Sequence, residues 1–203
     1  MRGEAELIHL NGNILCAVDG EMSGLVPGYH DLIEIAICPL DANYEPSQRV
    51  VPFSTLMRMK RPQNLDKRAL KVNGIREETL MLEGLDPWQA VTLFEDWFAR
   101  LKLMPGKRIM LLGHNLSIDA DFMKDWLGYR SFSYMFDSRI RDTMVLATAL
   151  NDRADLCAEE FPFNKVTLQW LCKKLEVPRE RRHRALEDAV ATAQCWKKMM
   201  RMM

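Results

Sequence analysis

Three short apolar runs follow one another closely near the start of the chain, and this order limits the folds available to it. The runs cover residues 14–19, 32–40 and 49–59. Pro52 lies within the third run and indicates a strand at the edge of a sheet, because proline cannot donate a ladder hydrogen bond. The short connections between the runs predict an antiparallel meander.

The rest of the chain alternates strand and helix patterns. Further strands are expected at residues 107–113 and 139–142, and residues 66–82 fit short helical pieces broken at Asn73-Gly74. Apolar residues at steps of three and four predict longer helices, over residues 87–103, the later part of 114–127, 143–151, 167–175 and 185–202. Because such alternation favours parallel strands, we expect an α/β fold with a mixed sheet flanked by helices.

The composition fits one folded domain and excludes several classes of protein. The chain has 203 residues, 48% of them hydrophobic, and we expect residues 1–203 to form a single domain with residues 1–12 as an N-terminal extension. Lys and Arg number 28 and Asp and Glu number 28, so the net charge is zero. This balance argues against disorder and against a long non-specific nucleic-acid-binding surface. It leaves room for a local contact with a few phosphates.

Cysteine spacing and the N-terminal residues predict a cytoplasmic protein without a membrane partner. The five cysteines are scattered and form no CxxC pair, so neither a zinc cluster nor a disulfide framework is indicated. We expect most of them to be buried thiols in a reducing compartment. The N-terminal residues lack the apolar region of a secretory signal, and no apolar run approaches the ~20 residues of a membrane-spanning helix.

Three polar clusters follow the ends of predicted elements. Asp19 and Glu21 end the first strand, where a period of two places both carboxylates on one side. At neutral pH two such acids repel each other unless a cation neutralises them, and Mg²⁺ or Mn²⁺ suits oxygen ligands. Taken alone, this pair fits solvated acids at a strand end much better than a metal site.

The second cluster follows the strand at residues 107–113 and contains His114, Asn115, Asp119 and Asp121. Polar residues after a buried strand often build sites in α/β proteins, although Asp119 could equally complement a helix dipole.

The third cluster is His183 with Asp188. Five helical residues rotate by about 140°, so the two side chains serve one site only if His183 precedes the helix that carries Asp188. Taken alone, the pattern around His183 predicts a surface residue beside a run of arginines at positions 179, 181, 182 and 184. Together, four carboxylates and one histidine are the inventory of two-metal phosphodiester hydrolysis.

At this point the motifs resemble those of a known family, the DEDDh 3′→5′ exonucleases of the DnaQ-like superfamily. VDGEMSGL resembles its DxExTGL motif, GHNLSIDADFM its HNxxFDxxFL motif and HRALEDA its HxAxxDA motif. The segments RDTMVLA and VTLQWLCKKLEV agree with weaker marks of the family, and the resemblance covers about residues 12–200. It implies an RNase H-like fold with a mixed five-stranded sheet flanked by helices.

The resemblance also implies roles for individual residues. Asp19, Glu21, Asp119 and Asp188 would hold two divalent cations, Mg²⁺ or Mn²⁺, and His183 would be the general base. Asp121 is an extra acid that the register places outside the metal site. A pocket for the terminal nucleotide would be formed by Met22, Ser23, Leu25 and Asn115, although Met22, Leu25 and Asn115 fit packing or loop-fixing roles equally well.

The implied activity is release of nucleoside 5′-monophosphates from the 3′ end of a nucleic acid, with single-stranded DNA favoured and RNA retained as a second substrate. An oligoribonuclease-like enzyme remains an alternative because EMSGL resembles that group's EMTGL. A proofreading subunit is disfavoured because only ~15 residues follow Asp188, about four helical turns. An inactive binding module is disfavoured because all five family positions are filled. The sequence leaves the oligomeric state open between a monomer and a homodimer.

Overall fold

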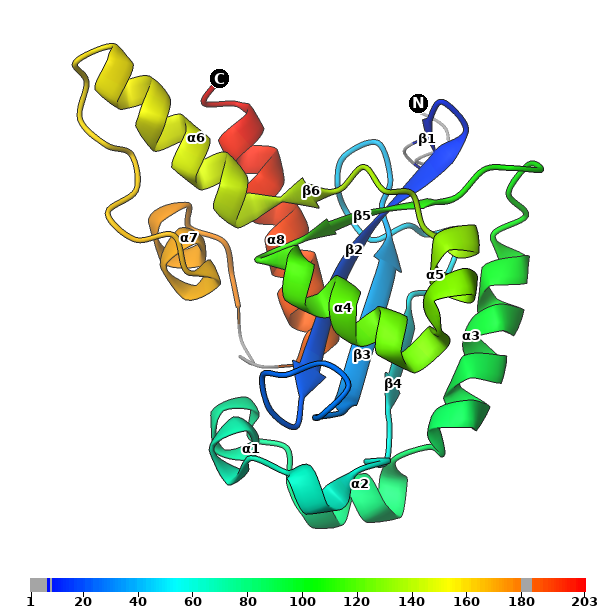
Figure 1. Ribbon diagram of the computed structural model, residues 1–203. Helices are drawn as coiled ribbons and strands as arrows, with labels where there is room; N and C mark the ends of the chain where they lie inside the picture. Colours follow the sequence, from blue (N-terminus) through cyan, green and yellow to red (C-terminus); the bar gives the residue numbers. More distant parts are fainter. Residues whose placement is uncertain (1–6, 8, 180–183) are drawn as a thin grey trace.

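A mixed sheet forms the centre of the molecule (Figure 1). The computed structural model describes residue 7, residues 9–179 and residues 184–203. Five strands lie in the order β4-β3-β2-β5-β6, with bounds β2 Asn13–Met22, β3 Leu32–Pro39, β4 Phe53–Leu56, β5 Ile109–Gly113 and β6 Arg141–Asp142. A two-residue strand, β1 (His9–Leu10), pairs with β2 inside the segment expected as an extension.

The strand directions confirm the predicted mixed sheet. β2 pairs antiparallel with β3, and β3 pairs antiparallel with β4, which lies at the edge as expected. Pro52 lies directly before β4 and not within it, so the strand is shorter than the run at residues 49–59. β5 runs parallel to both β2 and β6. The meander comes from the early runs with short connections, and the parallel strands come from the later segments that alternate with helices.

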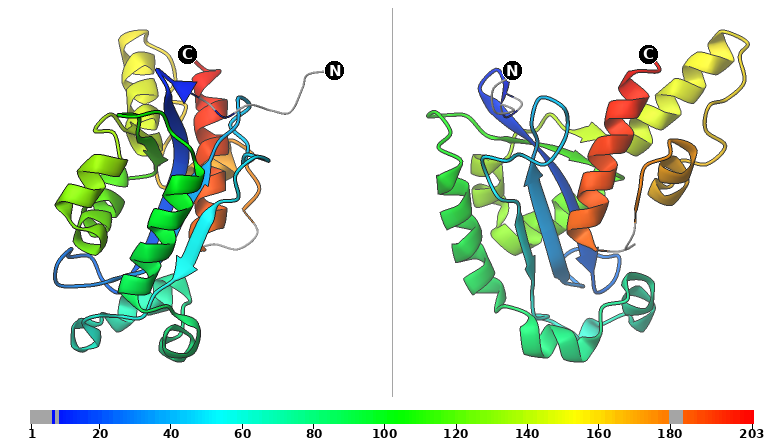
Figure 2. Two further views of the ribbon diagram at one scale, coloured as in Figure 1. Left: turned by 90° about the vertical axis from the view of Figure 1, so that its right-hand side faces the viewer. Right: turned by 180° about the vertical axis from the view of Figure 1, so that it is seen from behind.

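Helices cover both faces of the sheet (Figure 2). The helices α3 (Pro87–Arg100), α4 (Leu116–Leu127) and α5 (Tyr129–Met135) pack on one face, and α8 (Ala185–Met200) packs on the other. Two further helices, α6 (Thr143–Leu156) and α7 (Leu168–Lys174), build a separate core against α8. The remaining short helices are η1 (Pro62–Asn64), α1 (Lys67–Asn73) and α2 (Glu77–Glu83).

Most expected helices are present, with two differences. The helix α5 was not expected, and Trp88, placed on the apolar face of α3 by its spacing, is 73% exposed. Trp88 lies in the first turn, where Lys60 packs over its ring. No helix in the described part of the chain is long and apolar enough to span a membrane.

Alternation along β2 divides its side chains between the two cores. Cys16 and Val18 face the core that contains α3 and α4, whereas Leu15 and Ala17 face α8. Because side chains alternate with a period of two, the series that begins at Leu15 brings the acids at the end of β2 to the α8 side.

Candidate active site

Three carboxylates from two elements meet at the end of β2. Asp19 and Glu21 continue its α8-facing series, and Asp188 lies in the first turn of α8. One carboxylate oxygen from each residue lies within 4.8 Å of the others. The Asp188 side chain is only 4% exposed. The structure therefore brings together acids that are 169 positions apart in the sequence, from Asp19 to Asp188.

Asp119 approaches the same strand from α4. β2 pairs with β5 only as far as Ala17, so the end of β2 runs past its parallel neighbour. The buried Asp119 carboxylate occupies this place and accepts a hydrogen bond from the Gly20 backbone N–H. A Cβ at Gly20 would lie 3.2 Å from Asp119 Oδ1. The absence of a side chain at Gly20 therefore lets α4 place its acid directly against β2.

Repulsion and burial together disfavour ionisation of these acids. Burial raises the pKa of Asp19 well above its usual value, and the neighbouring charges of Asp119, Asp188 and Glu21 raise it further. Burial, followed by Asp188 and other acids, raises the pKa of Glu21 to about 8. Burial likewise raises the pKa of Asp119 to about 7, although the Gly20 hydrogen bond opposes this.

A buried arginine neutralises part of the negative charge of these acids. Arg179 donates from Nε and from a terminal guanidinium nitrogen to the two carboxylate oxygens of Asp188. Both side chains are nearly inaccessible, with exposed fractions of 8% and 4%. The charge of Arg179 also opposes part of the rise in the pKa values of Asp19 and Glu21. The sequence shows Arg179 only as one of a run of arginines beside His183, whereas the structure makes it part of the acidic cluster.

The donor set fits divalent cations. Carboxylate oxygens are hard ligands, and a group of buried acids with raised pKa values is stabilised when a cation replaces the bound protons. Asp19, Glu21 and Asp188 already lie close enough to share one ion. Asp119 lies close enough to Asp19 for its charge to raise the pKa of Asp19.

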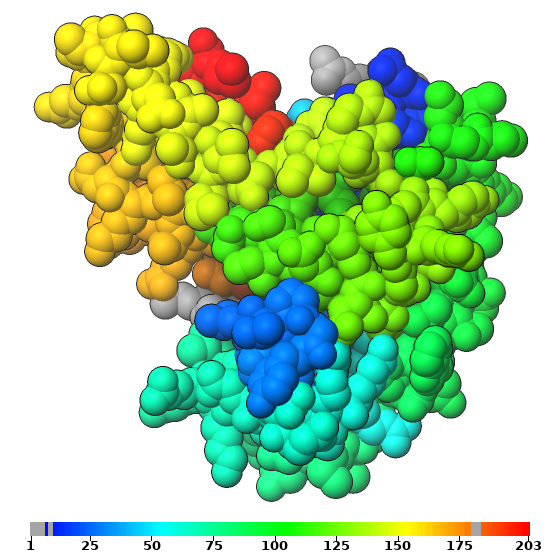
Figure 3. All heavy atoms as spheres, in the orientation of Figure 1, coloured from blue at the N-terminus to red at the C-terminus, as the bar shows by residue number. Residues whose placement is uncertain are grey.

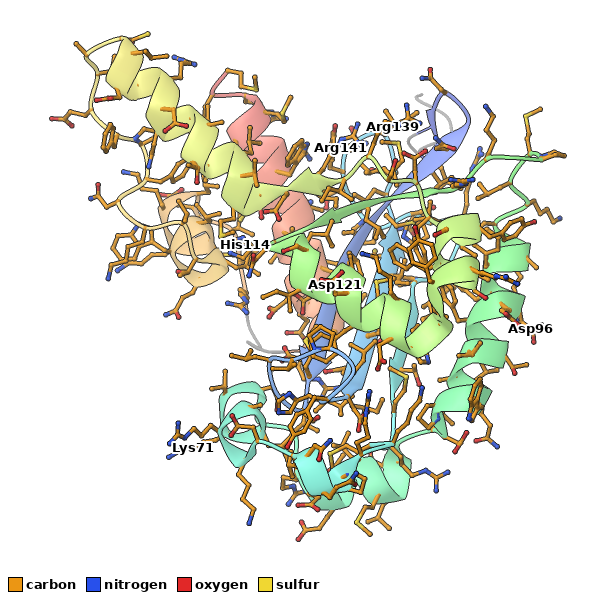
Figure 4. The ribbon with its side chains drawn as sticks, in the orientation of Figure 1. Lys71, Asp96, His114, Asp121, Arg139 and Arg141 are labelled. Carbon is orange, nitrogen blue, oxygen red and sulfur yellow. The ribbon has the colours of Figure 1, made fainter. Side chains whose placement is uncertain are left out.

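The structure separates Asp119 from the extra acid on the same helix. Asp121 is exposed and forms an ion pair with Lys124 at 2.8 Å, one turn along α4 (Figure 4). The structure thus buries Asp119 beside β2 and leaves Asp121 at the surface, and the assignment of the metal site to Asp119 stays a prediction. The predicted general base, His183, lies outside the described residues.

The four residues expected to bind the terminal nucleotide differ in exposure. Leu25 is 79% exposed on the loop between β2 and β3, which stands at the front of the molecule between α1 and α4 (Figure 3). Ser23 is fully buried, and its Oγ accepts a hydrogen bond of 2.9 Å from the Asp31 backbone. Met22 is partly buried against the core, and Asn115 begins α4 in a left-handed conformation. Ser23 therefore closes the loop through its contact with Asp31, and the Leu25 side chain is accessible to solvent.

That loop is fixed to α4 by an arginine that sequence reasoning missed. Arg61 binds Asp31 with Nε at 2.8 Å and also pairs with Asp125 on α4. Its guanidinium further donates to the carbonyls of Gly28 and His30. Arg61 therefore joins the second half of the exposed loop to the helix that carries Asp119.

Two more acids near the site were not predicted. Glu34 on β3 lies opposite Glu21 in the strand register and is 3% exposed. Asp142 ends β6 and contacts the start of α4. The available signal was a lone acid within an apolar run for Glu34, and an aspartate directly before a helix for Asp142.

Comparison with known sequences identifies relatives among exonucleases and polymerases. The chain is 30% identical to the 3′-5′ DNA exonuclease Cap18 of Escherichia coli over 112 residues, which is 54% of each protein. It is 25% identical to the PolC-type DNA polymerase III of Thermotoga petrophila over 186 residues, covering 92% of this chain and 12% of the polymerase. The chain thus spans about half of one curated relative and a small part of the other.

Solved structures show the same fold at low sequence identity. A zinc-bound complex of Escherichia coli exonuclease I with single-stranded DNA matches 93% of this chain and 40% of that protein, with a TM-score of 0.71 and 16% identity. Cell-death related nuclease 4 matches 93% of this chain and 64% of its own, with a TM-score of 0.66 and 16% identity. The predicted RNase H-like α/β architecture is confirmed. Because the model of the exonuclease family RNase_T matches residues 16–195, the chain belongs to that family, in agreement with its DnaQ-like motifs.

Proposed function

We propose that this chain is a divalent-metal-dependent 3′→5′ exonuclease that releases nucleoside 5′-monophosphates from the 3′ end of single-stranded DNA. The observation that carries the proposal is the meeting of Asp19, Glu21 and Asp188 within 4.8 Å in a member of an exonuclease family. Buried acids with raised pKa values are expected at sites built for chemistry.

Each residue has a distinct part in this proposal. Asp19, Glu21, Asp119 and Asp188 would hold two cations, Mg²⁺ or Mn²⁺. When bound, such ions stabilise negative charge on phosphate oxygens and make bound water more acidic. A neutral imidazole nitrogen of His183 would accept the proton of the attacking water. Leu25, exposed at the loop, would stack against the terminal base in a sequence-tolerant way.

DNA is favoured as the substrate because one relative is named as a DNA exonuclease and structures of another have been solved with DNA oligonucleotides. Cap18 is named as a DNA exonuclease, and exonuclease I has been solved with dT13 and with dA16. Zero net charge agrees with an enzyme that holds a few terminal phosphates instead of a long duplex. RNA remains the alternative to be tested in the same assay.

The test uses one oligonucleotide sequence, made as DNA and as RNA. A label at the 5′ end shows stepwise shortening as a ladder of products, and a label on the 3′ terminal nucleotide shows its release as a monophosphate. We expect a ladder from DNA with Mg²⁺ or Mn²⁺, little product with Ca²⁺, and none with chelator. An undiminished rate in chelator would contradict the metal assignment, and faster digestion of RNA would reverse the substrate assignment.

A matched pair of variants on α4 separates the site from its surroundings. Asp119→Asn should abolish digestion, whereas Asp121→Asn, which removes an equal charge two residues along the same helix, should retain it. Asp121 is exposed and pairs with Lys124, so its loss leaves the acidic cluster intact. Equal effects of the two substitutions would contradict the role of Asp119.

A further inference from the structure

Among the described residues, the two helices that carry Asp119 and Asp188 have no cap from the side chain of their own N-cap residue. A helix leaves its first backbone N–H groups without intrahelical partners, and a side chain at the N-cap usually accepts one of them. The N-cap of α4 is Asn115 and that of α8 is Arg184, and neither side chain forms a capping hydrogen bond. By contrast, Asp86 caps α3, a helix without a predicted site residue.

At α4 the hydrogen-bond acceptor is Asp142, the last residue of strand β6. The Asp142 carboxylate accepts a 2.7 Å hydrogen bond from the Leu116 N–H and a 3.1 Å bond from the Asn115 N–H. It also caps its own helix, α6, through the N–H of Met144 at 2.8 Å. One carboxylate therefore fixes the start of α4, one turn before Asp119, to the start of α6 and to the end of β6.

At α8 the corresponding carboxylate is Glu34 of β3. Glu34 Oε1 accepts from Arg184 Nε at 3.1 Å, and Oε2 lies 3.5 Å from the Ala185 N–H, the first residue of α8. The Glu34 side chain is 4% exposed, whereas that of Arg184 is 48% exposed. A buried acid in a strand thus holds the residue between His183 and the helix of Asp188.

We propose that Glu34 and Asp142 are positioning residues, each capping from a separate strand one of the two helices that deliver an acid to the metal site. This inference rests on the proposed function. A carboxylate anchored in the sheet fixes the first turn relative to β2, which a cap within the same helix cannot do. Because both ligand helices begin at the sheet's acidic end, their acids are held at fixed positions relative to Asp19 and Glu21.

The test compares alanine and amide variants at both positions with a matched capping control. We expect Glu34→Ala and Asp142→Ala to lower kcat and to weaken Mn²⁺ binding by roughly 10–100-fold, the usual effect of groups that orient metal ligands. The KM for the oligonucleotide should stay within about threefold of wild type, because the nucleotide-facing loop is unchanged. Glu34→Gln and Asp142→Asn keep an acceptor oxygen and should recover part of both losses.

The control is Asp86→Ala, which removes the cap of α3 and its 2.9 Å bond from the Trp88 N–H. It should lower the midpoint of urea unfolding while leaving kcat and Mn²⁺ affinity unchanged. The inference is overturned if the Glu34 and Asp142 variants keep wild-type kcat and Mn²⁺ affinity, or lose them only as their folded fraction falls.

Direct titration with Mn²⁺ alone keeps this result separate from the proposed function. If wild type binds Mn²⁺ but digests no oligonucleotide, the proposed function fails while the affinity comparison still decides the roles of Glu34 and Asp142. If wild type digests DNA and the variants match it, the positioning roles fail while the proposed function stands.

Discussion

The stability of the metal-free protein should fall as the pH rises from about 5 to about 8. The pKa of Glu21 is about 8 in the folded chain against 4.5 as its ordinary value, and that of Asp119 is about 7 against 3.8. The folded state therefore binds protons more tightly than the unfolded state. The stability that these two protonated acids contribute is fully present below their ordinary pKa values, and it is lost as the pH rises toward the raised values.

The magnitude follows from the size of the pKa differences. At 1.36 kcal/mol for each pH unit, the raised pKa of Glu21 corresponds to about 5 kcal/mol and that of Asp119 to about 4 kcal/mol. Because neighbouring acids share protons, the two values are not additive. We expect a total loss on the order of 5 kcal/mol, a large fraction of the 5–15 kcal/mol that is typical for a domain.

Urea unfolding followed by tryptophan fluorescence measures this loss at pH 5, 6, 7 and 8 in the presence of a chelator. Glu21→Gln should flatten the pH dependence, whereas Asp121→Asn should keep it, because Asp121 is exposed and outside the cluster. Saturating Mn²⁺ should also flatten it, since cations replace the protons. A free energy of unfolding in chelator that stays constant or rises from pH 5 to pH 8 would refute the electrostatic reasoning.

Three further predictions follow from single contacts. Asp19→Asn and Asp188→Asn should both abolish digestion. In chelator, Asp19→Asn should keep or raise the thermal midpoint, whereas Asp188→Asn should lower it, because Arg179 loses its buried partner and the free energy of unfolding falls by about 3 kcal/mol. Equal thermal midpoints of the two variants would contradict this. Arg61→Ala should raise the KM for the oligonucleotide with kcat nearly unchanged, because the loop carrying the exposed apolar side chains loses its anchor to α4; an unchanged KM would exclude this role. His183→Ala should lower kcat by roughly 10²–10⁴-fold, the usual contribution of a general base, with Mn²⁺ affinity retained; a loss explained by weaker Mn²⁺ binding would remove this role.

Local patterns in the sequence were sufficient for most of the elements and for the order of the acids. The alternation that places Leu15 and Ala17 on one side of β2 also fixes the side of Asp19 and Glu21, because it depends only on backbone geometry. Similarly, Pro52 marked the edge strand, since the missing N–H is a local property. Motif spacing was enough for membership of the exonuclease family, which the family match confirms.

The tertiary structure decided which charges meet. Glu34 binds Arg184, which is 150 positions away in the sequence, and Asp142 caps a helix that begins 26 positions earlier. Local residue spacing does not predict such contacts. The sequence shows Arg179 in a run of arginines, whereas the tertiary structure buries its side chain against Asp188. The raised pKa values of the acids arise from this burial and mutual proximity. Residue order therefore determined the inventory of the site, and only the packing of α4 and α8 against β2 determined its electrostatics, because Coulomb energies depend on distance and on exclusion of water.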